Sequence, residues 1–265
     1  MTIPPLLFAL TMWFIGTALV VWLDSRPRAT FATSFTLAGV AAVVATGAAW
    51  WSADDPHRGG AYLGFAAAIV IWGWHEMGFL MGFVAGPNRA QCPPQATGWR
   101  RFRLATATVI HHEVALAATA LLLVALTWRQ PNQAAPLTFL LLFALRLSAK
   151  FNLYLGVPNL SDEVFPAHLA YLKSYFRKRA FNPLLPLSLL GAAAVAWWAW
   201  GIAEAAPPRS GTAATATLLA GLAALGVVEH LFLVLPLRDA KMWHWASAKN
   251  QAIEIAAHEV RGGTP

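Results

Sequence analysis

Histidine and glutamate residues cluster inside two long apolar stretches of the chain. His75 and Glu76 lie within AYLGFAAAIVIWGWHEMGFLMGFVAG, and His111, His112 and Glu113 lie within LATATVIHHEVALAATALLLVALTW. Imidazole and carboxylate groups can ligate metals or carry protons. An ionisable group at the centre of a membrane-spanning helix costs about 2.5 kcal/mol or more, so such residues are usually paired or functional. These five residues are therefore candidates for a buried site.

Two further apolar segments also carry ionisable groups. Glu229 and His230 lie in one of them, and Arg146 and Lys150 lie four residues apart in the other, on one face of a helix. At 1.5 Å per residue, the histidines and carboxylates sit roughly 9 to 17 Å inside one leaflet. We therefore expect the two cations to form structural ion pairs with carboxylates at that depth. The candidate partners are Glu76, Glu113 and Glu229.

Several interpretations of this cluster are open. The cations could reach the membrane surface along their own stems, and the ion pairs could simply hold helices together. In a first functional hypothesis, one histidine binds the central metal of a tetrapyrrole such as haem or (bacterio)chlorophyll. The candidate ligands for such a cofactor are His75, His111, His112 and His230.

In a second functional hypothesis, the cluster holds two iron ions for oxidoreductase chemistry on a pigment or another lipid-soluble substrate. Its metal ligands would be Glu76, Glu113 and Glu229 together with the histidines. The spacing differs from the HxxxH and HxxHH patterns of membrane hydroxylases, and the nearby cations oppose a second dication. The tetrapyrrole is therefore the favoured cofactor. A transporter is the third possibility, but no broken helices at matching repeat positions support it.

The composition predicts the kind of fold that holds these residues in place. Of the 265 residues, 58% are hydrophobic and only 12% are charged, whereas a soluble domain has about 25% charged residues. The chain is therefore predicted to be an all-α membrane protein, a single domain with a bundle of about seven transmembrane helices. The net charge of +7 follows the loops between the helices, which indicates membrane lipids and not nucleic acid as its partner.

Seven apolar segments are long enough to cross a hydrocarbon core of about 30 Å. The predicted spans are residues 3–23, 30–51, 60–86, 104–128, 134–152, 182–204 and 212–236. Two amphipathic helices are predicted to lie at the membrane surface. In each, apolar residues recur at helical spacing along one face, and basic residues lie beside them. They cover residues 161–179, after the fifth span, and residues 239–260, at the C-terminus.

Several strings of the sequence resemble one known family. WGWHEMGFLMGFVAGP, GWRRFRLAT, HHE and RLSAKFNLYLGVPNLSDEVFPAHLAYLKSYF are similar to the photosynthetic complex assembly protein 2 family (PuhE) of purple photosynthetic bacteria. The resemblance runs from the first span through the first surface helix. It implies a role in assembling the reaction centre with its core light-harvesting antenna in the inner membrane, with subunits of those complexes as partners. It implies no catalytic residue.

The basic residues predict the orientation of the chain. Loops after the first, third and fifth spans, together with the C-terminal tail, carry fourteen lysines and arginines, and the opposite side carries three. Because basic loops stay in the cytoplasm, we predict a periplasmic N-terminus and a cytoplasmic C-terminus in the inner membrane.

Reporter fusions test this orientation. Fusions after Trp51, Trp128 and Gly211 should report the periplasm, and fusions after Arg28, Arg103 and Arg179 should report the cytoplasm. A periplasmic signal at Arg103 would overturn the prediction.

Overall fold

The structure is a computed structural model that describes residues 3–160 and 166–235. Within these residues it contains seven α-helices and no β-strand, and all seven helices are long and apolar enough to cross a membrane. The predicted all-α membrane bundle is thereby confirmed. The helices are α1 (Ile3–Asp24), α2 (Phe31–Ser52), α3 (Arg58–Leu80), α4 (Gly98–Leu126), α5 (Ala134–Leu155), α6 (Leu184–Ala205) and α7 (Gly211–Phe232).

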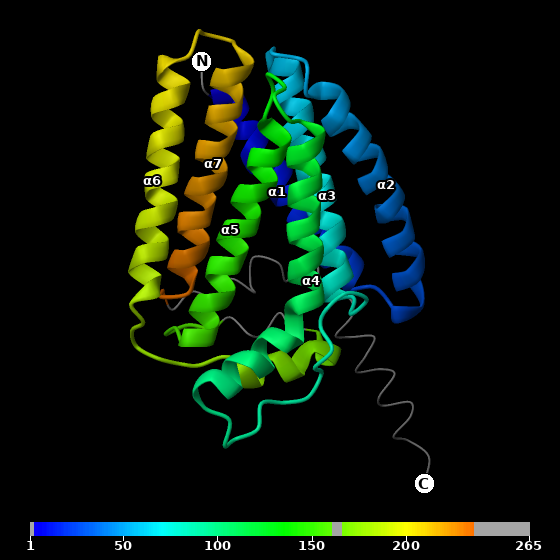
Figure 1. Cartoon of the computed structure of the whole chain (residues 1–265), viewed down its shortest axis with the longest axis vertical. Coiled ribbons are helices and arrows are strands. Elements are labelled where there is room, and N and C mark those ends of the chain that lie inside the picture. Colours follow the sequence, from blue (N-terminus) through cyan, green and yellow to red (C-terminus); the bar gives the residue numbers. More distant parts are fainter. Residues whose placement is uncertain (1–2, 161–165, 236–265) are drawn as a thin grey trace.

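Helices α3 and α7 form the interior of the bundle. In each, 56% of the apolar window is buried, whereas no other helix exceeds 33%. Helix α7 packs against α1, α3 and α6, and α3 also packs against α2 and α5. Figure 1 shows α6 at one edge of the bundle, with α7 beside it, and α2 at the other edge. Polar groups on α3 and α7 can therefore find partners within the protein and need not face lipid.

Small residues bring the helices together at the end of the bundle that carries few basic residues. Ala61, Ala134 and Ala214, from α3, α5 and α7, form one buried cluster. A Cβ atom added at Gly64 would lie only 3.2 Å from the backbone nitrogen of Ala135. Small side chains allow such close approach, and dispersion contacts between the helices then replace contacts with lipid.

The third span is shorter than predicted. Helix α3 ends at Leu80 and not at residue 86, and the chain then folds against α4. The turn uses Gly82 at φ 81°, a conformation that favours glycine. The backbone N–H of Asn88 donates to the carbonyl oxygen of Ala107 at 3.0 Å. Helix α4 begins at Gly98, six residues before its predicted start.

The folded segment 81–88 also disturbs α4. The carbonyl oxygen of Ala85 accepts the backbone N–H of His112 at 3.0 Å, in the middle of the helix. An inserted hydrogen-bond partner of this kind commonly bends a helix. Figure 1 shows the first turns of α4 running obliquely across one end of the bundle before the helix enters it. This end carries most of the basic loop residues and is called the basic end below. The hydrophobic pattern of the sequence does not indicate that segment 81–88 contacts α4 in this way.

The first predicted surface helix differs in type and length. A 3-10 helix, η3 (Ala167–Tyr175), lies where residues 161–179 were expected to be α-helical, and residues 161–165 lie outside the described part. Leu169 and Leu172 are buried against α3 and segment 81–88, so this face contacts protein and is not free for lipid. The C-terminal helix predicted at 239–260 lies wholly outside the described residues.

Polar contacts fix η3 and its flanking turns to the basic end of the bundle. Burial lowers the pKa of His168, and its ring donates from Nε2 to the carbonyl oxygen of Leu80 at 2.7 Å. The buried guanidinium of Arg101 donates to the carbonyl oxygen of Tyr175 and lies 4.2 Å from the ring centre of Tyr154. These contacts connect α3, α4 and α5 at one end.

Substitution of Gly86 tests the contact between segment 81–88 and α4. A Cβ at this position would lie 2.2 Å from the carbonyl oxygen of Ala107, so the backbone must move. We expect Gly86→Ala to lower the apparent melting temperature of the detergent-purified protein, at a cost of ~1–3 kcal/mol. Gly191→Ala is the matched control and should keep the wild-type melting temperature, because a Cβ there meets nothing within 4 Å. Equal melting temperatures for the two variants would refute the contact between Gly86 and α4.

Candidate functional site

Two ion pairs cross the interior of the bundle. Arg146 Nη2 donates to Glu76 Oε2 at 2.8 Å and joins α5 to α3, and Lys150 Nζ donates to Glu113 Oε1 and joins α5 to α4. The two carboxylate side chains are 11% and 14% exposed. Removing one partner of a buried pair costs about 3–5 kcal/mol, because the other charge remains without compensation. The two pairs therefore fix how α3, α4 and α5 are rotated relative to one another.

Two of the four candidate histidines are held by hydrogen bonds. His75 Nε2 lies 2.9 Å from Thr119 Oγ1, which connects α3 to α4. Both ring nitrogens of His230 are engaged, one 3.0 Å from Ser148 Oγ and the other 2.8 Å from the carbonyl oxygen of Gly226. A ring with both nitrogens occupied is not available to a metal, so the geometry does not support His230 as a cofactor ligand.

His112 is fully buried and lies beside the first ion pair. Its side chain is 0% exposed, its Nε2 lies 3.8 Å from Glu76 Oε1, and neither ring nitrogen has a hydrogen-bond partner in the described part of the chain. The ring of Phe79 packs on it with centres 4.8 Å apart. A macrocycle has no route to this imidazole, although a water molecule could bridge it to Glu76.

His111 points away from the interior, about 100° around the helix from His112. It is exposed on the outer surface of the bundle, near the middle of the 29-residue α4. Ala107 and Ala115, one turn away on either side, are small, so they leave the helix backbone accessible. Among the four candidate histidines, His111 is thus the only one with an imidazole that an external planar group can reach.

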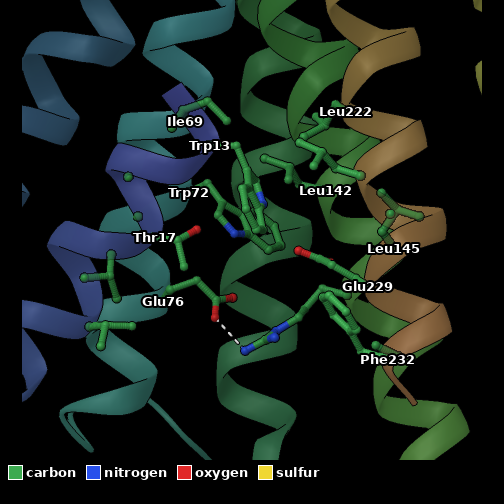
Figure 2. A pocket seen from close by; sticks show the side chains of 18 of the residues that line it. Trp13, Thr17, Ile69, Trp72, Glu76, Leu142, Leu145, Leu222, Glu229 and Phe232 are labelled. Atoms are coloured by element: carbon green, nitrogen blue, oxygen red, sulfur yellow. Dashed lines mark hydrogen bonds and ion pairs between the residues drawn. The ribbon is translucent and has the colours of Figure 1, made fainter. Parts of the chain in front are cut away.

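Glu229 is exposed and belongs to neither ion pair. It lines a cavity of about 370 Å³ between α1, α3, α5 and α7, together with Glu76 and Arg146. The indole of Trp13 hydrogen-bonds to the Glu229 carboxylate. Figure 2 shows Glu76 and Glu229 on opposite sides of the cavity, with the Arg146 ion pair drawn as a dashed line below them. The cavity side of the cluster thus contains two carboxylates and one cation.

The described residues contain no group of three or more histidine, cysteine, aspartate or glutamate side chains that could hold a metal ion. Glu76 and Glu113 each bind a cation, and Glu229 lies across the cavity from Glu76. The arrangement is therefore suited to ion pairing, to hydrogen bonding of a ligand in the cavity, and to contact with a planar group at His111. It gives no support to the di-metal alternative.

Three participants were not identified from the sequence. Trp13 contributes to the cavity from α1, and Thr119 and Ser148 bind His75 and His230. Thr119 and Ser148 are polar residues inside apolar segments, which is a weak signal that could have marked them. Trp13 carries no such signal, because the chain contains 13 tryptophans.

Fold and site together define a seven-helix membrane protein with internal ion pairs. The chain belongs to the DUF3623 family, described as a protein of unknown function, whose model matches residues 1–254. It is 37% identical over 271 residues to an "Uncharacterized 30.4 kDa protein in puhA 5'region" of Rhodobacter capsulatus, with 98% of each chain covered. Neither description carries the name PuhE. No solved structure matches the chain.

A comparison of single and double variants tests the Glu76–Arg146 pair. Glu76→Gln leaves the cation without its partner, and we expect it to lower the apparent melting temperature. Because the Arg146 side chain is 42% exposed at the cavity, the cost should be about 1–3 kcal/mol and not the roughly 3–5 kcal/mol of a fully buried pair. The double variant Glu76→Gln/Arg146→Gln removes both charges and should recover much of that loss. Glu204→Gln, at the opposite end of the bundle in α6, is the control. If the single variant is as stable as the double variant, the ion pair does not bear on stability.

Proposed function

We propose that this protein is an integral membrane assembly factor for the photosynthetic reaction centre and its core light-harvesting complex. The observation that carries the proposal is the full-length similarity to a protein encoded beside puhA, a reaction-centre gene. The motifs similar to PuhE support the same role. The proposed location is the bacterial inner membrane, with the basic end in the cytoplasm. Membrane lipids and reaction-centre or antenna subunits are its proposed partners.

The assembly role includes a pigment contact at His111. A neutral imidazole is a suitable axial ligand for the metal of haem or of a (bacterio)chlorophyll-type tetrapyrrole. His111 is accessible from the membrane, whereas His112 is enclosed and both ring nitrogens of His230 are occupied. The alanines beside His111 permit a flat ring to lie close to α4. A factor of this kind would hold pigment at its outer surface, where a partner helix can receive it.

Deletion of the gene tests the assembly role. In a phototrophic host, we expect loss of the protein to lower the amount of assembled reaction centre and core antenna without abolishing phototrophic growth. Absorption spectra of membranes and quantification of complex subunits measure the effect. Normal complex levels under several growth regimes would contradict the proposal. A block in one pigment or carotenoid intermediate would also contradict it and would favour an enzyme.

Substitution of His111 tests the pigment contact separately. Protein purified in mild detergent from a pigment-producing host should show a tetrapyrrole absorption band, and His111→Leu should lose most of it, because the axial ligand is removed. His57→Leu is the matched control, since His57 is an exposed histidine that lies outside the cluster and hydrogen-bonds to Asp55. Retention of the band in His111→Leu, or about two irons per chain with no such band, would reject this ligand.

A further inference from the structure

We infer that the cavity between α1, α3, α5 and α7 binds a neutral, membrane-soluble carbonyl compound of the quinone class. This inference does not depend on the pigment contact at His111, which lies on the outer surface of α4. The cavity lies in the half of the bundle nearer the basic loops, and its volume of about 370 Å³ falls in the range of ligand-binding cavities, roughly 300–1,000 Å³.

The walls of the cavity suit a planar head group with an apolar tail. Most of the lining side chains are aliphatic, and two are tryptophans, Trp13 from α1 and Trp72 from α3. Figure 2 shows the two indoles beside each other, between Glu76 on one side of the cavity and Glu229 on the other. Aromatic faces favour offset stacking on flat conjugated rings, and the aliphatic side chains can enclose an isoprenoid tail.

Arg146 supplies hydrogen-bond donors to this cavity. Its side chain is 42% exposed although it lies inside the bundle, and it lines the cavity. A guanidinium has five N–H donors, and the ion pair with Glu76 uses Nη2. Because the ion pair takes only one of these donors, the exposed part of the guanidinium can donate another to an acceptor oxygen on a ligand.

The charges around the cavity select against an anionic ligand. Glu76 already compensates Arg146, and Glu229 adds a second carboxylate, so an anion such as a fatty acid would meet a neutral or negative site. A neutral molecule that accepts from Arg146 and donates to Glu229 avoids this repulsion and binds both groups.

A quinone-class ligand matches the remaining groups. Its carbonyl oxygen can accept from Arg146, and the hydroxyl group of its reduced form can donate to Glu229. Glu229 is accessible because its carboxylate faces the cavity, where Trp13 provides a further donor to it. The proposal concerns binding of either form and includes no redox step.

A cavity-filling variant provides the test. A Cβ at Gly73 would lie 3.7 Å from Val20, an ordinary contact, so Gly73→Leu should fold and occupy the cavity. Gly191→Leu is the matched control, with nothing within 4 Å of its Cβ. Decylubiquinone is titrated into each protein in nanodiscs made without quinone, with empty nanodiscs as the partition control. Quenching of tryptophan fluorescence reports binding.

We expect saturable binding to the wild type, at least a tenfold weaker affinity for Gly73→Leu, and wild-type affinity for Gly191→Leu. Glu76→Gln/Arg146→Gln, which removes both charges of the ion pair, should weaken binding about two- to tenfold through loss of the guanidinium donors. Quinone should also be extracted with the purified wild type. Absence of saturable binding, equal affinity for Gly73→Leu, or extraction of a fatty acid or phospholipid in place of quinone would overturn the inference.

Discussion

The pairing of cations inside an apolar bundle is the constraint on which the structure depends. Helix α5 presents Arg146 and Lys150 one turn apart, and each binds a carboxylate from a different helix. Because charges are expensive to leave unpaired in hydrocarbon, α3, α4 and α5 have little freedom to rotate or slide relative to one another. The same rotation of the helices directs two histidines of α3 and α4 into the bundle. His75 is directed toward Thr119, and His112 toward Glu76.

The rotation of each helix about its axis limits how much of the site the sequence could predict. Apolar length predicted seven helices, and the four-residue spacing of Arg146 and Lys150 placed them on one face. Adjacent residues of a helix differ by about 100° in direction, so periodicity alone could not decide which of His111 and His112 faces the interior. The structure buries His112 and exposes His111. Their roles as cofactor ligands remain predictions.

The remaining differences come from contacts between segments far apart in the chain. Residues 81–86 are as apolar as the helix before them, so length predicted a longer third span. Their backbone binds α4 instead, and η3 packs over them. Such insertion depends on a close approach at Gly86 that no local pattern marks. The cavity likewise arises where four helices from both halves of the chain meet, and hydropathy gives no sign of it.

We propose two separate sites for lipid-soluble molecules, one in the cavity at Arg146 and Glu229 and one on the outer surface of α4 at His111. The proposed assembly role depends on the site at His111, where a pigment on the outer surface of α4 could pass to a partner helix. A structure of the protein purified from pigment-producing cells, determined by electron microscopy with a bound antibody fragment, tests this most directly. We predict a tetrapyrrole ring packed against α4, with its central metal bound by the imidazole of His111. A ring held by another side chain, or an outer face of α4 covered by lipid alone in pigment-containing protein, would contradict it.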